Sequence, residues 1–163
     1  MSGTMPNIAF VSTAHIHTRG YLEYIAKATD GPTAYAIWDD IPDRGRRYAT
    51  NFQSKFVADL DVLLRDPEVD GFVIAAENTR HLPLFKRVVP VGKPVLCDKP
   101  LVTTTGEVRE VVALFERHPG TKVLCGYFQP FGGQMQAAAK LVNEGAFGKI
   151  TRVRFRKDRK SVV

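Results

Sequence analysis

Short apolar runs alternate with amphipathic stretches along this chain, and that alternation limits the possible folds more than any other feature. Runs of strand length lie at 8–11, 33–38, 56–57, 70–76, 95–97 and 123–125. Between them, apolar residues recur at near-helical spacing, in 21–28, 46–52, 59–64 and the stretch opened by 103–105. Such alternation is typical of βαβ units. We therefore expect an α/β fold with a doubly wound, mostly parallel sheet.

A lysine follows the fifth apolar run. Val95, Leu96 and Cys97 suit a strand covered on both faces, and Pro100 ends it because proline has no amide hydrogen. Ligands bind at the carboxyl ends of strands in open parallel sheets, which makes Lys99 a candidate catalytic residue. The alternative is a solvated surface lysine.

Four stretches resemble, in order and spacing, motifs of the glucose-fructose oxidoreductase / inositol dehydrogenase (Gfo/Idh/MocA) family. Residues 97–100 resemble its Glu-Lys-Pro motif, with Asp98 in place of glutamate. Residues 76–81 resemble Thr-Pro-Asn-x-x-His, 126–131 resemble Gly-Tyr-x-x-x-Phe, and 140–150 resemble its helix-to-strand segment. The resemblance implies a Rossmann nucleotide-binding domain followed by a substrate domain.

The resemblance also implies an activity: NAD(P)-dependent hydride transfer between nicotinamide and a sugar, polyol or related secondary alcohol. Lys99 would hydrogen-bond the reacting hydroxyl and tune proton transfer, and Asp98 would orient Lys99 and contact the cofactor. Tyr127 and Gln129 would line the cofactor or substrate cleft, although simple packing of Tyr127 is an equal alternative. The competing hypothesis is a non-catalytic, dinucleotide-binding regulatory or scaffold protein.

The loop after the first strand departs from the family. Its three glycine positions hold Ser12, Ala14 and His17. Ser12, Thr13 and Ala14 are small enough to leave room for a pyrophosphate at the following helix N-terminus. His15 and His17 are candidates for contacts with phosphate or substrate. Solvated loop histidines are the commoner case, and no metal site is expected because nothing nearby completes a ligand set.

Asp39 ends the second strand about 20 residues beyond that loop, the usual spacing of a ribose-binding carboxylate. It would accept hydrogen bonds from the adenosine ribose and favour NAD(H) over NADP(H). An Asp-Asp turn is the alternative. Binding of NADP(H) remains an alternative, because three arginines follow soon after: Arg44, Arg46 and Arg47.

Two further candidates follow the fourth strand. The resemblance implies that Asn78 binds the nicotinamide ribose, with helix capping as an equal alternative. His81 matches the histidine of the same family motif and is a cofactor-binding candidate by that match. Its position inside a helix favours a structural role.

Composition excludes several classes of protein. The formal charge of +6 arises from 149–163, which holds seven basic residues and one acidic residue, whereas the remainder has 16 of each. This distribution does not predict nucleic-acid binding. No apolar run approaches the roughly 20 residues of a membrane span, and 1–6 has no signal core. We expect a cytoplasmic protein in which Cys97 and Cys125 are reduced core residues.

We expect a Rossmann domain at 1–125 and the start of a truncated substrate and oligomerisation domain at 126–157. Its helix is predicted at 134–143 and its strand at 150–156. Because the family's catalytic histidine falls outside the sequence, the chain alone is expected to be inactive, and the full-length protein to be a homo-oligomer. Residues 158–163 correspond to one reading frame of a common sequencing adapter, which suggests a non-native tail.

Overall fold

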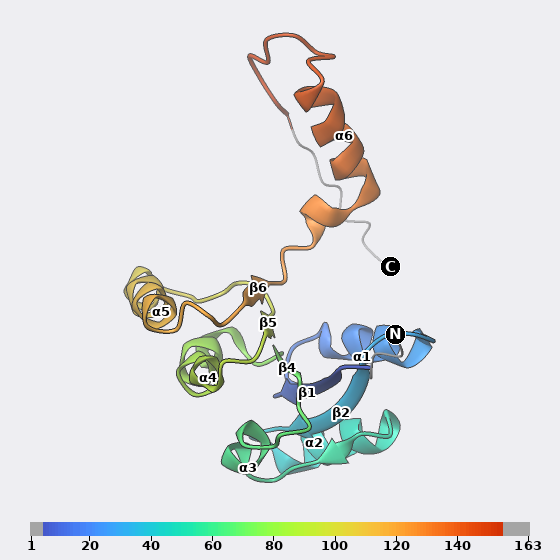
Figure 1. Cartoon of the computed structure of the whole chain (residues 1–163), viewed down its shortest axis with the longest axis vertical. Helices are drawn as coiled ribbons and strands as arrows, with labels where there is room; N and C mark the ends of the chain where they lie inside the picture. Colours follow the sequence, from blue (N-terminus) through green and yellow to red (C-terminus); the bar gives the residue numbers. More distant parts are fainter. Residues whose placement is uncertain (1–4, 155–163) are drawn as a thin grey trace, which may run out of the picture. The chain divides into compact units, whose positions relative to one another are not determined.

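The computed structural model describes residues 5–154, without the side chain of Gln129 (Figure 1). The chain divides into two compact units, Met1–Gly126 and Tyr127–Val163. Within the described residues, no helix is both long and apolar enough to cross a membrane. The predicted tail at 158–163 lies outside these residues.

One parallel sheet forms the centre of the first unit, in the strand order β3-β2-β1-β4-β5-β6. The strands are β1 Asn7–Val11, β2 Thr33–Trp38, β3 Lys55–Phe56, β4 Gly71–Ile74, β5 Val95–Cys97 and β6 Val123–Cys125. Every neighbouring pair is parallel, which confirms the predicted doubly wound fold. The strand order reverses between β1 and β4, and this switch point is where ligands bind in such sheets.

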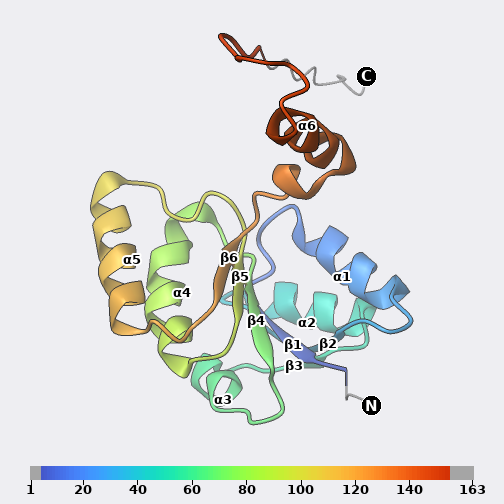
Figure 2. The ribbon, with the colours of Figure 1, turned by 45° about the horizontal axis from the view of Figure 1, so that its top comes forward.

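Helices cover both faces of the sheet. They are α1 Thr18–Lys27, α2 Pro42–Asn51, α3 Leu60–Leu64, α4 His81–Val88 and α5 Thr105–Arg117, with 3-10 turns η1 Asn78–Arg80 and η2 Val89–Val91. Figure 2 shows α1 and α2 on one side and α4 and α5 on the other. Side chains alternate along β1, so Phe10 packs with Leu22 of α1, whereas Ala9 and Val11 belong to the cluster that includes α4 and α5.

Local capping sets the starts of two helices. The Asp59 side chain accepts from the Asp61 amide at the start of α3. Thr104 caps α5 and forms a reciprocal capping box with Glu107. These hydrogen bonds satisfy amides that the first helical turn leaves without partners.

Several predicted boundaries need correction. α2 begins at Pro42 and not at residue 46, because proline fits the first helical position, where no amide donor is needed. β3 lies one residue earlier than predicted. β4 ends at Ile74, after which the buried residues 75–76 leave the sheet toward η1.

Burial is incomplete on α5 and β6. On α5, Val111 and Leu114 are buried, but Val108 and Val112 are 48% and 49% exposed, because they lie on the outer side of the helix. On β6, Leu124 is 48% exposed although it lies in an apolar run. β6 is the last strand of the described sheet, so it lacks a neighbour on one side.

The second unit contains η3 Gln129–Phe131 and α6 Gly133–Asn143, which confirms the predicted helix. A turn follows, with Gly145 and Gly148 at φ 71° and 61°. The predicted strand is wrong for 150–154, the described part of that stretch. A strand forms only where a neighbour satisfies its backbone groups, and the described residues offer none there.

Candidate functional site

Four loops meet at the carboxyl edge of the sheet. They follow β1, β2, β4 and β5, and parallel pairing brings these strand ends to one side. These loops, with the η1 turn and the first residue of α4, hold the predicted candidates Ser12, Thr13, Ala14, His15, His17, Asp39, Asn78, His81, Asp98 and Lys99. Tyr127, which is 57% exposed, and Gln129 belong to the second unit, and their roles stay predictions.

Ser12 adopts the backbone conformation that glycine usually provides. Its φ is 68°, in the left-handed region, where a residue with a Cβ loses roughly 1–2 kcal/mol. Its amide donates to the Trp38 carbonyl at 2.8 Å and fixes the loop to β2. The first of the three glycine positions therefore keeps its tight turn without a glycine.

Asp39 is buried, and both oxygens of its carboxylate accept hydrogen bonds from the protein. Its Oδ2 accepts from the Thr13 amide at 2.8 Å and from the Thr13 hydroxyl, and its Oδ1 accepts from the Ile41 amide at 2.8 Å. Arg44 donates to the same carboxylate, with Nη2 2.8 Å from Oδ1. A carboxylate offers about four acceptor sites, so this one has none left.

The prediction that Asp39 directly accepts ribose hydroxyls stays a prediction, and this geometry adds a condition to it. A ribose reaches the carboxylate only if Arg44 leaves it. The bond from the Ile41 amide agrees with the turn alternative, since aspartate side chains commonly bond the amide two residues on.

The Arg44 guanidinium is surrounded by carboxylates. Besides Asp39, it contacts Asp40 at 2.9 Å and Glu77 at 3.3 Å, and its side chain is only 17% exposed. Arg80 lies 3.6 Å from Asp40. Three acids and two arginines give this corner a net charge of −1.

Asp98 connects the β1–α1 loop to the end of β5. Its carboxylate is fully buried and lies 2.9 Å from Nδ1 of both His15 and His17. It accepts from the Lys99 amide at 2.7 Å and from the Tyr21 hydroxyl at 3.0 Å. Sequence reasoning missed Tyr21, because its spacing identifies only a residue on the inner face of α1.

Burial affects the proton affinity of the groups around Asp98. It lowers the pKa of His15, although the Asp98 carboxylate opposes this effect. Burial and the hydrogen bond to Asp98 raise the pKa of the Tyr21 phenol, which therefore stays protonated. Burial also raises the pKa of the Cys97 and Cys125 thiols. Both thiols are free, but only Cys97 is fully buried.

His81 has a structural position. It is completely buried, with Nδ1 2.7 Å from the Pro100 carbonyl and Nε2 3.2 Å from the Ala76 carbonyl. Its ring therefore joins the end of β4 to the turn after Lys99. The structural interpretation agrees with these contacts, and direct cofactor contact does not, because the side chain is not accessible.

Asn78 and Lys99 remain available at the edge. Asn78 is exposed, and η1 and α4 have Glu77 and Arg80 at their N-caps, so the alternative of helix capping by Asn78 is wrong. Lys99 is half-buried and precedes Pro100 through a cis peptide. Lys99 directly follows Asp98 after the end of β5, and its catalytic role stays a prediction.

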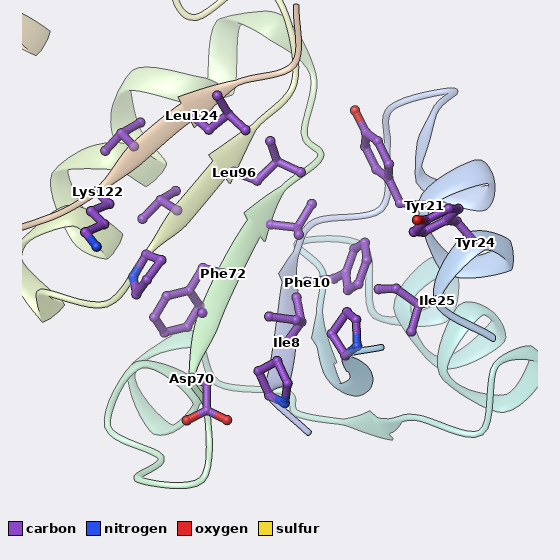
Figure 3. A pocket seen from close by; sticks show the side chains of 17 residues that line it. Ile8, Phe10, Tyr21, Tyr24, Ile25, Asp70, Phe72, Leu96, Lys122 and Leu124 are labelled. Atoms are coloured by element: carbon purple, nitrogen blue, oxygen red, sulfur yellow. The ribbon is translucent and has the colours of Figure 1, made fainter. Parts of the chain in front are cut away.

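The first unit also has an apolar hollow away from this edge. A cavity of about 540 Å³ runs along the face of the sheet beside α1 and is almost entirely apolar. Figure 3 shows Phe10 and Phe72 of the sheet, Tyr24 and Ile25 of α1, and Leu96 of β5 around it. It does not include Lys99 or Asp98.

The strand order, the switch point and the loops around it define a dinucleotide-binding type of fold. Residues 7–127 match the family described as "Oxidoreductase family, NAD-binding Rossmann fold". The chain therefore belongs to the Gfo/Idh/MocA family of oxidoreductases, as its four motifs predicted.

Individual relatives share this part of the chain. The inositol 2-dehydrogenase of Acidothermus cellulolyticus is 29% identical over 119 residues, which make up 72% of this chain and 35% of that protein. The scyllo-inositol dehydrogenase of Lactobacillus casei, solved with NAD(H) and scyllo-inositol, matches with a TM-score of 0.79 and 20% identity, over 91% of this chain and 44% of that one.

A third relative binds the other cofactor. KijD10, a 3-ketoreductase from Actinomadura kijaniata solved with TDP-benzene and NADP, has a TM-score of 0.73 and 22% identity, over 87% of this chain and 44% of that one. These structural similarities show the fold alone. The chain spans about a third of the curated relative and less than half of the two solved structures.

Proposed function

We propose that this chain is the nucleotide-binding part of an NAD(P)-dependent oxidoreductase acting on a sugar, polyol or related secondary alcohol. The observation that carries the proposal is the position of Lys99, immediately after β5 at the carboxyl edge, with its amide bonded to Asp98 at 2.7 Å. Membership of an oxidoreductase family supports it.

The β1–α1 loop fits a dinucleotide despite its missing glycines. Ser12 already has the required left-handed turn, and Thr13 and Ala14 are small. The ten-residue helix α1 begins directly after the loop, and a helix N-terminus favours an anion. Ser12 to His17 would hold the pyrophosphate and Asn78 the nicotinamide ribose. When bound, the nicotinamide supplies or accepts the hydride.

Lys99 would donate a hydrogen bond to the reacting hydroxyl and influence its proton transfer. Asp98 is a positioning residue, because its carboxylate is buried and accepts from the Lys99 amide. His81 has a similar indirect role, since it bonds the carbonyl of Pro100, the next residue.

NAD(H) is the cofactor that the β2 corner favours. Asp39, Asp40 and Glu77 surround Arg44, so the corner has a net negative charge and the guanidinium is already paired. A 2'-phosphate would be repelled by these acids and would have to displace one of them from Arg44.

A second function has two specific observations in its favour. Arg44 saturates Asp39, and His17 stands where the family has its third glycine. A protein that binds a dinucleotide weakly and performs no chemistry, as a regulator or scaffold, is consistent with both features.

Calorimetric titration of the 163-residue chain with NADH tests the cofactor site. We expect saturable binding, weakened at least about 10-fold by Ala14→Glu, since like charges about 4 Å apart repel by several kcal/mol near a protein surface. Ala26→Glu, on the exposed side of α1, is the matched control. No saturable binding of NADH or NADPH would overturn the proposal.

A further inference from the structure

We propose that His15, His17 and Asp98 form a binding site for a divalent transition-metal ion, with Zn²⁺ as the expected occupant. One ligand atom from each of the three lies within 4.8 Å of the others. The fold creates this set, because Asp98 is 81 residues from His17 in the chain. This proposal does not depend on the proposed oxidoreductase role, because the site binds a metal ion and requires neither cofactor nor substrate.

The distances are close to those of a coordination sphere. Asp98 Oδ2 is 2.9 Å from Nδ1 of His15 and 2.9 Å from Nδ1 of His17. In a tetrahedral zinc site with bonds of about 2.0–2.1 Å, neighbouring ligand atoms are roughly 3.3 Å apart. Small rotations of the side chains are therefore sufficient to admit an ion.

Hydrogen bonding explains only one of the two histidine contacts. His17 Nδ1 is placed to donate to both oxygens of Asp98, at 3.2 Å and 2.9 Å. No hydrogen bond joins the His15 and Asp98 side chains in the described structure, although the atoms are 2.9 Å apart. Instead, His15 Nδ1 accepts from the His17 amide at 3.3 Å.

An accepting nitrogen beside a carboxylate oxygen places two lone pairs near each other. When His15 is neutral and its Nδ1 accepts from the His17 amide, neither atom provides a proton for this contact, which is an ion pair only if His15 is protonated. A cation between them turns the repulsion into coordination, because neutral imidazole and carboxylate are both metal ligands. The arrangement of His15 and Asp98 is thus better suited to holding an ion than to a hydrogen bond.

Burial and neighbouring groups also favour a bound metal ion at this cluster. The Asp98 side chain is 0% exposed, whereas His15 is 12% and His17 43% exposed, so a buried anion lies beneath an entrance from solvent. The Tyr21 hydroxyl and Lys99 amide hold the carboxylate in place, as outer-shell groups do in metal sites. Two imidazoles and one carboxylate suit Zn²⁺ or Co²⁺ better than Mg²⁺ or Ca²⁺. Three protein ligands leave a fourth position open.

Titration of the chelator-treated 163-residue chain with Co²⁺ tests the site, because bound Co²⁺ gives a visible absorption spectrum that reports its geometry. We expect one ion per chain, displaced by Zn²⁺ and not by Mg²⁺. His15→Ala and His17→Ala should each weaken Zn²⁺ binding at least about 100-fold, since even outer-shell changes cost about 10–100-fold.

His118→Ala is the matched control, because His118 follows α5 and is outside the cluster. His17→Ala is the variant best able to fold, since this half-exposed side chain makes no capping bond to α1, and circular dichroism checks this. Absence of saturable Co²⁺ and Zn²⁺ binding overturns the proposal. Binding that survives in both His15→Ala and His17→Ala also overturns it.

Discussion

The Nε atom of Arg44 lies 3.1 Å from Oδ1 and 3.0 Å from Oδ2 of Asp39. Because Asp39 also bonds Thr13, this pair connects the start of α2 to the end of β2 and to the β1–α1 loop. The carboxylate that sequence spacing assigns to ribose is thus part of the internal structure.

Arg44→Met should destabilise the protein by about 3–5 kcal/mol, because it leaves the Asp39 carboxylate buried without its countercharge. Urea denaturation measures the change in the free energy of unfolding. Arg46→Met is the control, since Arg46 pairs with Asp43 at the surface and should cost less than about 1 kcal/mol. Equal losses in the two variants would contradict a special role for the Asp39–Arg44 pair.

The same pair should make stability depend on acid pH. Burial acts to raise the pKa of Asp39, but hydrogen bonds from Arg44 and Thr13 outweigh it and hold that pKa below its usual value. The contribution is fully present above the unfolded-state pKa of about 3.9 and is lost as the pH falls through the lower folded-state pKa.

Unfolding of wild type and Asp39→Asn should be compared from about pH 7 to about pH 2. The stability advantage of wild type should stay constant down to about pH 4 and shrink below it. Asp43→Asn, whose exposed side chain has no buried partner, should stay parallel to wild type throughout. If the stability advantage of wild type over Asp39→Asn grows as the pH falls, the predicted direction of the pH dependence is wrong.

His81→Leu should destabilise the first unit by about 1–3 kcal/mol, because a buried carbonyl beside the ring loses its N–H donor. The carbonyls beside the ring belong to Pro100 and Ala76. Thermal and urea unfolding measure the effect, with His118→Leu at the end of α5 as control. A neutral His81→Leu variant would mean that these contacts do not hold the turn after Lys99.

The chain should bind NADH more tightly than NADPH. The double variant Asp40→Asn, Glu77→Gln should reduce that preference by about 10-fold, since each charge removed near a phosphate changes its energy by on the order of 1 kcal/mol. Calorimetry with both cofactors measures the ratio, and Asp43→Asn is the control. Tighter binding of NADPH to the wild-type chain would contradict the proposed selectivity.

These 163 residues should show no turnover alone. In a protein that carries a substrate domain after this unit, Lys99→Ala should lower kcat by about 10²-fold, the usual scale for a positioned proton-transfer group. Lys99→Arg should not restore it, because a guanidinium stays protonated and differs in shape from an ammonium. Lys27→Ala, at the exposed end of α1, is the control. Full activity of Lys99→Ala in steady-state kinetics would refute the mechanism.

The sequence by itself determined the order of the elements. Apolar runs such as 33–38 and 95–97 match β2 and β5 residue for residue, and Thr104 starts α5 as its capping chemistry predicts. These features depend on interactions within a few residues, which a sequence pattern contains. The carboxyl edge followed from the same alternation, because parallel strands bring their ends to one side.

Only the tertiary structure decided which side chains meet at that edge. The pairing of Asp98 with His15 and His17 joins segments more than 80 residues apart, and it depends on how β1 and β5 are placed around β4. The Asp39–Arg44 pair could not be predicted from the sequence either, because α2 begins earlier than its apolar pattern indicates. Exposure of Val108 and Leu124 was also decided by packing. Spacing fixes which strand end a residue occupies, but the partner of its side chain depends on loops closing in three dimensions.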